Sequence, residues 1–153
     1  MEPQSFDARR PFWRADALAA GISSRRLAGP RFRRIFQPVY ISSAVPETEA
    51  ERVFAALMLH PEGAWISHLS AAAWWGVVVP DTSVVHVSVT QASDRRWRPG
   101  LKPHVAPVGT PTLVRAGART SSAVRMFVEL ASMLDLVDLV VAGDSLIRVF
   151  GMT

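Results

Sequence analysis

The chain has 153 residues, of which 49% are hydrophobic and 20% charged, with no cysteine and a formal net charge of +4. These values fit one typical domain or two small ones with a buried core, and they exclude a disordered chain, disulfide bonds and thiolate metal sites. The sequence shows no apolar run of the roughly 18 residues that a membrane span needs and no N-terminal signal-peptide core. We therefore expect a cytoplasmic protein that does not contact membranes.

Positive charge is concentrated near the N-terminus. Residues 1–40 hold eight arginines and three acids, a net charge of +5, whereas residues 41–153 hold nine basic and ten acidic groups, a net charge of −1. Such a localised excess of arginine favours a polyanionic partner such as DNA. The alternative is a stable subdomain whose arginines serve solubility or contacts with the rest of the chain.

The first predicted elements are two short helices. Residues 14–21, "RADALAAG", read as a helix with Ala15, Leu18 and Ala19 on one apolar face and with a C-terminal glycine cap. Ser23 or Ser24 can then cap a second helix, "SRRLAG", which stops at a Gly-Pro pair. Two short helices around a glycine turn are the minimal helix-turn-helix pattern.

Residues 31–42, "RFRRIFQPVYIS", predict two short strands around a Gln-Pro turn. Helix, turn, helix and hairpin in this order are the layout of a winged helix. The sequence therefore predicts an α+β protein, with a winged helix-turn-helix DNA-binding region at residues 1–45. A small mixed α/β domain with C-terminal helices, for dimerisation or partner binding, is expected at residues 46–153.

The second region starts with a helix from about residue 47, and its other elements follow the apolar pattern. Alternating valines make residues 84–90 the clearest strand. We expect a helix at 68–75, a partner strand at 101–108, a small hairpin at 112–119 and helices at 123–134 and 136–149. The buried side of the helix at 123–134 is expected to hold Val124, Phe127, Val128, Leu130 and Ala131. The last helix is apolar on two faces, which predicts that it lies against the core.

No catalytic pattern is found in the sequence. The histidines stand at positions 60, 68, 86 and 104, none at a zinc-site i, i+4 spacing, although His86 and His104 could face each other across a hairpin. Lone strand histidines are more often structural, so no metal ligand, cofactor or catalytic residue is assigned. No glycine-rich phosphate loop or nucleophile elbow is present. The single lysine, Lys102, has no acidic cluster near it, which disfavours a nuclease site.

The candidate DNA-binding residues lie at the start of the second helix and in the expected wing. Arginines bind phosphates, hydroxyls assist them, and a recognition helix presents such residues to a groove. The residues assigned to this role are Ser24, Arg25, Arg26, Arg31, Arg33 and Arg34.

Several segments together resemble a family of actinobacterial winged-helix proteins related to AbiEi-type antitoxins of type IV toxin–antitoxin systems. The segments are "PFWRADALAAGISSRRLAGPRFRRIFQPVYI", "ISHLSAAAWWGV", "VHVSV" and "TSSAVRMFVELASMLDLVDLVVAGDSLIR". The resemblance implies double-stranded DNA binding, repression of the protein's own operon and neutralisation of a nucleotidyltransferase-like toxin. Longer members carry a very-short-patch-repair-like endonuclease domain, absent here, so no catalytic residue is carried over. A "TSPARTF"-like segment of the family is altered here to "TSSAVRMF".

The sequence thus favours a non-enzymatic DNA-binding protein, an antitoxin-like autorepressor that could form a homodimer. A protein–protein module that neutralises a toxin or binds another partner is the first alternative. The second alternative is the DNA-targeting part of a nuclease family member that lacks its catalytic domain.

Overall fold

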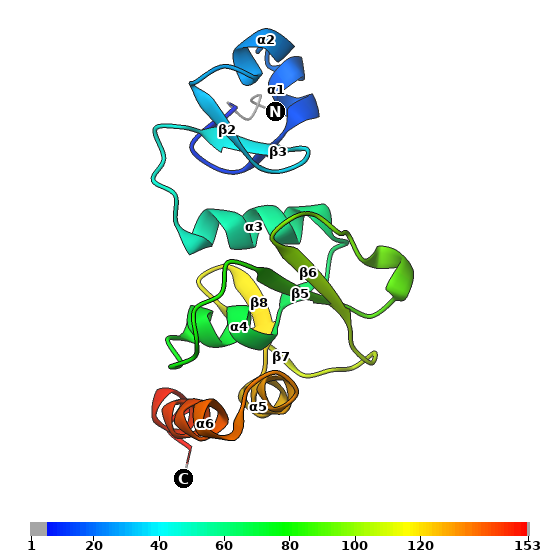
Figure 1. Cartoon of the computed structure of the whole chain (residues 1–153). Coiled ribbons are helices and arrows are strands. Elements are labelled where there is room, and N and C mark those ends of the chain that lie inside the picture. Colours follow the sequence, from blue (N-terminus) through cyan, green and yellow to red (C-terminus); the bar gives the residue numbers. More distant parts are fainter. Residues whose placement is uncertain (1–5, 153) are drawn as a thin grey trace. The chain divides into compact units, whose positions relative to one another are not determined.

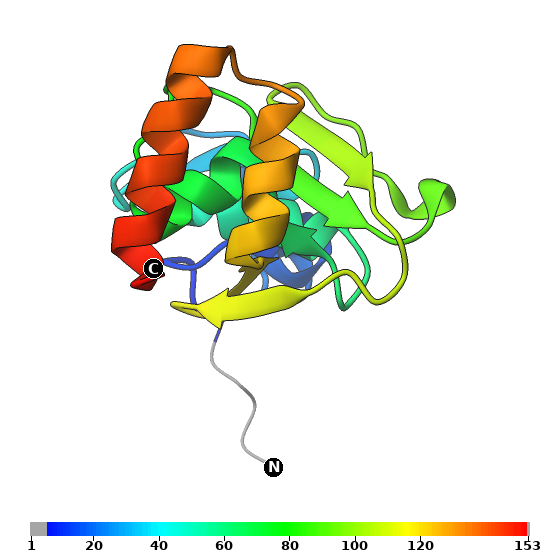
Figure 2. The same cartoon turned by 90° about the horizontal axis from the view of Figure 1, so that it is seen from below.

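A computed structural model describes residues 6–152 and is shown in Figures 1 and 2. Within these residues the chain forms six α-helices, one short 3₁₀ helix and two β-sheets, so the expected α+β class is confirmed. The chain divides into two compact units, an N-terminal unit Met1–Ala56 and a C-terminal unit Leu57–Thr153. The division falls inside helix α3 (Glu49–Leu59), whereas the boundary expected from the sequence lies before this helix, at residues 45–46.

The N-terminal unit combines two short helices with a three-stranded antiparallel sheet of order β1-β3-β2. Its elements are β1 (Phe12–Trp13), α1 (Arg14–Ala19), α2 (Ser24–Leu27), β2 (Phe32–Phe36) and β3 (Val39–Ser42). The predicted hairpin around Gln37-Pro38 is therefore confirmed.

Local capping explains where the two short helices begin and end. Gly21 has a φ of 87° and follows α1, a conformation that favours glycine. The Ser23 side chain accepts a hydrogen bond of 3.2 Å from the backbone N–H of Arg26, so Ser23 caps α2 as predicted. The residues that share one apolar face of α1, Ala15, Leu18 and Ala19, are exposed, and the buried residue of this helix is Ala17. Ala17 packs with Phe12 and Leu27 in a small core.

Helix α3 (Glu49–Leu59) follows the N-terminal sheet. Its start is fixed by Glu51, whose carboxylate accepts hydrogen bonds from the backbone N–H of Thr48 at 3.0 Å and from the Thr48 hydroxyl. Partial burial acts to raise the pKa of Glu51, but the hydrogen bonds from Thr48 and the nearby Arg33 outweigh it, and the pKa is lowered. The arrangement is the reciprocal half of a capping box.

Replacing Glu51 by alanine is expected to destabilise α3 by about 1 kcal/mol, the usual cost of losing a helix cap. Glu49→Ala is the matched control, since Glu49 is an exposed acid in the same first turn. Because the folded-state pKa of Glu51 is lowered, its contribution is present at neutral pH and is lost as pH falls through that pKa. Thermal unfolding followed by circular dichroism measures the loss of stability in each variant. An equal loss in Glu51→Ala and Glu49→Ala would contradict the capping role of Glu51.

The C-terminal unit is built on a five-stranded mixed sheet of order β6-β5-β4-β8-β7. Its strands are β4 (Trp65–Ile66), β5 (Val85–Val89), β6 (Leu101–Val105), β7 (Thr112–Arg115) and β8 (Ala118–Ser121). A short 3₁₀ helix, Ala92–Asp94, lies in the connection between β5 and β6. The hairpin β7–β8 turns at Ala116 and Gly117, which have φ values of 48° and 81°, and confirms the predicted hairpin.

The pairing of β5 with β6 differs from the sequence-based expectation. The two strands are parallel, with His86 opposite Lys102 and Ser88 opposite His104, so they do not form a hairpin. The side chains of β5 also do not alternate between core and solvent, because all five residues of the strand are buried. The alternation of valine with His86 and Ser88 therefore separates the two covered faces of the strand and not core from solvent.

Three helices accompany this sheet: α4 (His68–Trp75), α5 (Ala123–Ala131) and α6 (Leu136–Phe150). Helix α4 lies against β5 and β8, α5 packs on α4, and α5 and α6 lie side by side (Figures 1 and 2). Gly76, with a φ of 78°, ends α4 where the sequence predicted. None of the helices in residues 6–152 is long and apolar enough to cross a membrane.

The burial of α5 and α6 corrects two expectations, the set of buried side chains on the helix at 123–134 and the burial of the last helix against the core. Helix α5 buries Ala123, Met126, Glu129 and Leu130, whereas Val124 is 70% exposed and Phe127, Val128 and Ala131 are also exposed. Helix α6 buries only Ala142, Ser145 and Leu146. The large apolar side chains of α6 that remain exposed are Leu136, Val137, Val140, Val141, Ile147 and Val149. These helices therefore leave an apolar surface uncovered within the described residues.

Candidate functional site

Three of the predicted DNA-binding arginines gather around one hollow of the N-terminal unit. The hollow has a volume of about 400 Å³ and is lined by Arg25, Arg26, Gly29, Pro30 and Arg31. All three arginine side chains are exposed. Among residues 6–152, no ion pair or hydrogen bond engages these three guanidinium groups. Unpaired arginines around a concave surface leave their positive charge available to an anionic ligand.

The other predicted residues are partly engaged within the unit. The hydroxyl of Ser24 accepts a hydrogen bond of 3.0 Å from the Arg14 side chain, which ties α1 to α2. Arg33 is half-buried and donates to the backbone carbonyls of Val45 and Pro46 at 3.1 and 3.3 Å. Arg34 is exposed and donates to Gln37 at 3.1 Å. A phosphate-binding role for these residues stays a prediction.

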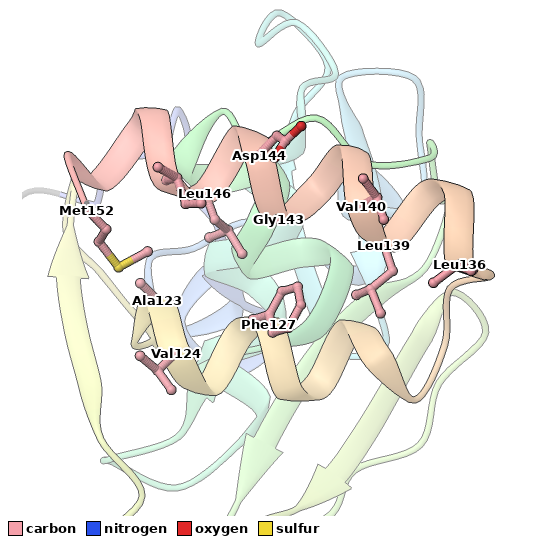
Figure 3. Close-up of a pocket in the computed structure, with 11 residues that line it drawn as sticks. Ala123, Val124, Phe127, Leu136, Leu139, Val140, Gly143, Asp144, Leu146 and Met152 are labelled. Atoms are coloured by element: carbon pink, nitrogen blue, oxygen red, sulfur yellow. The ribbon is translucent and has the colours of Figure 1, made fainter.

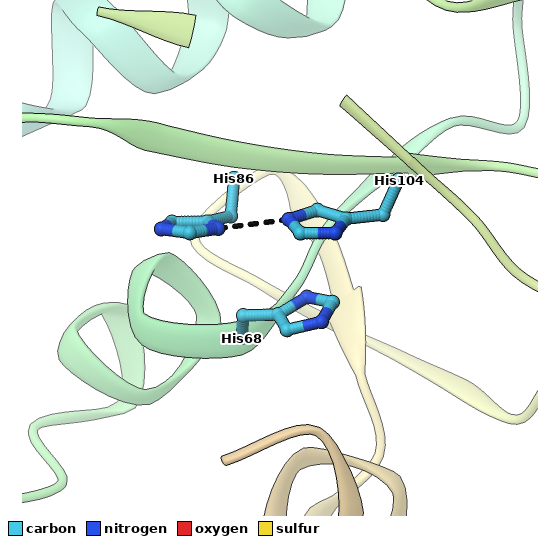
Figure 4. A group of neighbouring side chains, drawn as sticks. All are labelled: His68, His86 and His104. Atoms are coloured by element: carbon cyan, nitrogen blue, oxygen red, sulfur yellow. Dashed lines mark hydrogen bonds between the residues drawn. The ribbon is translucent and has the colours of Figure 1, made fainter. Parts of the chain in front are cut away.

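A second group of functional side chains lies in the C-terminal unit, where His68, His86 and His104 meet (Figure 4). His86 Nδ1 and His104 Nε2 are 2.8 Å apart, and one ring nitrogen from each of the three residues lies within 4.8 Å of the others. His68 stacks on His104 with ring centroids 3.8 Å apart. Only the pair on the strands was expected from the sequence, because nothing local connects the start of α4 with β5 and β6.

Burial keeps these imidazoles neutral at physiological pH. Burial first, and then the neighbouring His104 and His86 and the cations Arg125 and Lys102, lower the pKa of His68 to about 3. Burial, with smaller effects of His104 and Lys102, lowers the pKa of His86 to about 4. Burial and Lys102 lower the pKa of His104 to about 4. Neutral imidazoles can accept a hydrogen bond or bind a metal ion.

A hydrogen-bond network holds His68 in place. Its backbone N–H donates to Glu129 Oε2 at 2.9 Å, and its Nδ1 lies 2.9 Å from the Ser67 hydroxyl. Ser88 in turn donates to Ser67 at 2.7 Å. Glu129 also lies 4.0 Å from His68 Nδ1, but its charge is matched by Arg125 at 3.0 Å. The cluster is therefore supported by buried, satisfied polar groups rather than by loose surface contacts.

A third feature is the apolar groove between α5 and α6, with a volume of about 500 Å³. Figure 3 shows Phe127 pointing from α5 toward Gly143 of α6. A Cβ atom at Gly143 would lie 3.1 Å from the Phe127 ring, so glycine permits this approach. The groove presents almost no polar group and suits an apolar partner better than a polar substrate.

The sequence matches no protein-family model and no curated protein. The resemblance to AbiEi-like proteins therefore stays an expectation drawn from its motifs.

Proposed function

We propose that the protein binds double-stranded DNA through the N-terminal unit, as a winged-helix, antitoxin-like repressor without enzymatic activity. The observation that carries this proposal is the group of three exposed arginines, Arg25, Arg26 and Arg31, around one hollow, whose side chains have no partner within residues 6–152. In this proposal α2 is the recognition helix and the β2–β3 hairpin is the wing. The AbiEi-like resemblance supports the assignment and would make the operator part of the protein's own operon.

Exposed guanidinium groups bind phosphates at little desolvation cost. Arg25 and Arg26 stand on α2 within reach of the same ligand as Arg31, because all three line one hollow. Arg34 is exposed on β2 and would contact the DNA backbone next to the phosphate bound in the hollow. Each phosphate contact releases condensed counterions, so the proposed binding weakens steeply with salt.

Fluorescence anisotropy with a labelled duplex of mixed sequence tests the proposal. Replacing Arg25 and Arg26 by alanine is expected to reduce affinity at low salt about tenfold or more. The slope of log affinity against log salt is expected to fall by about 2, one for each lost phosphate contact. The matched control is the double variant Arg119→Ala/Arg148→Ala, which removes two exposed arginines of the C-terminal unit. Undetectable binding at low salt, or an equal loss in the control, contradicts the proposal.

The apolar groove supports a second candidate function, binding of a partner protein by the C-terminal unit. Exposed apolar side chains on adjacent helices are typical of protein-binding surfaces, and here Val137 and Val140 are 72% and 55% exposed. The partner in this proposal is a second copy of the chain or a nucleotidyltransferase-like toxin. Sedimentation velocity distinguishes a monomer from a dimer, and Val140→Asp is expected to abolish the association.

A further inference from the structure

The three histidines of the C-terminal unit converge from separate parts of the chain. His86 is the second residue of β5, His104 comes from the adjacent parallel strand β6, and His68 stands at the first position of α4. Figure 4 shows the rings of His86 and His104 side by side and the ring of His68 next to them. One nitrogen of each lies within 4.8 Å of the others. The ring planes lie 13° to 25° apart and His68 stacks on His104, so the rings have to turn before the three nitrogens point to a common centre.

The nitrogen separations suit a small metal ion after a limited adjustment. A Zn–N distance of about 2.1 Å in a tetrahedral site places neighbouring nitrogens about 3.4 Å apart. The His86–His104 pair at 2.8 Å has to open slightly, and the His68 nitrogen has to approach. One proton now lies between His86 Nδ1 and His104 Nε2. On metal binding this proton moves to the other nitrogen of the imidazole that carries it. Both nitrogens of the pair are then free for the metal, and no net proton uptake or release is needed.

The backbone of His68 is held in an uncommon conformation. Its φ is 53°, in the left-handed region that a non-glycine residue seldom adopts. Such strain persists only where surrounding contacts enforce it, and it is frequent at functional sites. Here Glu129 enforces it by accepting the His68 N–H, and Ser67 can hold a proton on Nδ1 and leave Nε2 as the ligand atom. Outer-shell partners of this kind orient metal-binding histidines.

We propose that His68, His86 and His104 form a binding site for one divalent transition-metal ion, with zinc as the expected ion. Imidazole ligands favour zinc and its neighbours over magnesium or calcium. Three histidines leave a fourth coordination position for water, as in open zinc sites.

The charges around the cluster are compatible with one added cation. Lys102 and Arg125 are the cations that act on these histidines. Lys102 is exposed, so solvent screens its charge, and Arg125 is paired with the buried Glu129 at 3.0 Å. The proposal is independent of DNA binding, because the cluster belongs to the C-terminal unit.

Isothermal titration of the full chain with Zn²⁺ tests the site, using protein without a polyhistidine tag that has been stripped of metal. We expect one equivalent to bind and His104→Gln to weaken the binding by about tenfold or more. His68→Asn is the second variant, because asparagine tolerates a positive φ. The matched control is His60→Gln, since His60 is a buried histidine outside the cluster whose Nε2 accepts a hydrogen bond from the Arg96 backbone N–H.

A measurement on the unmodified chain keeps the test independent of variant folding. The NMR signals of the imidazole Cε1–H groups are followed during zinc addition. Shifts or broadening of the three cluster histidines, without a comparable change at His60, support the site. Absence of binding, equal weakening by His60→Gln, or zinc effects that leave the three signals unchanged would overturn the proposal.

Discussion

Replacing Glu129 by alanine is expected to destabilise the C-terminal unit by about 3 kcal/mol. Glu129 is only 4% exposed, yet its carboxylate accepts hydrogen bonds from the backbone of His68, the hydroxyl of Ser121 and the side chain of Arg125, at 2.9, 3.0 and 3.0 Å. Alanine would leave the His68 N–H without its partner and the Arg125 cation without its counter-charge. Leaving buried polar groups unsatisfied is among the largest single-residue effects on stability.

Urea unfolding monitored by tryptophan fluorescence measures this effect, because Trp65, Trp74, Trp75 and Trp97 report on the C-terminal unit. Asp144→Ala is the control, since Asp144 is an exposed acid on α6 and its loss should change stability by about 0.5 kcal/mol or less. Glu129→Gln retains the side-chain shape and one acceptor oxygen. Its loss of stability is expected to lie between those of Glu129→Ala and Asp144→Ala. A Glu129→Ala effect no larger than that of the control would refute a role of this carboxylate in holding α5 to α4.

The metal-free protein is expected to lose stability as pH falls from about 6.5 toward 4. The pKa values of His68, His86 and His104 are lowered to about 3, 4 and 4, so these imidazoles stay largely neutral in the folded chain until the pH approaches 4. The unfolded chain takes up protons near pH 6.5 and is thereby favoured. For the buried His86 alone the loss reaches about 2 kcal/mol at pH 5. The charged groups that face the cluster are Lys102, Arg125 and Glu129.

Thermal unfolding in the presence of a chelator, at several pH values between 7 and 4, checks this expectation. The midpoint is expected to fall steadily through the interval and to change little between pH 7 and 8, where the histidines are neutral in both states. His86→Gln removes one titrating group and should flatten the dependence, provided that the variant folds at pH 7. A midpoint that is constant from pH 7 to 5 would show that the folded cluster takes up protons as readily as the unfolded chain.

Helix ends and turns followed from the sequence because they depend on contacts between near neighbours. Ser23 was one of two serines expected to cap the second helix, and its side chain accepts a hydrogen bond from the backbone N–H three residues later. Ser122 and Asp135 cap α5 and α6 in the same way. Gly76 ends α4, and Gly117 helps to turn the β7–β8 hairpin with a positive φ. These interactions span only a few residues, so local composition and spacing suffice to predict them.

The placement of side chains across the fold required the tertiary structure. Parallel pairing of β5 with β6 brings His86 and His104 together, and α4 adds His68 from 18 residues before His86. The burial of Glu129 and the exposure of Val124 likewise depend on which side of α5 meets α4.

Local sequence therefore determined the order of the elements and the clustering of arginines in residues 1–40. Capping and turn formation act over a few residues, and charge can be counted along the chain. Strand direction, helix rotation and the meeting of three histidines are set by packing between distant segments. That packing is a property of the whole core, which no short stretch of sequence specifies.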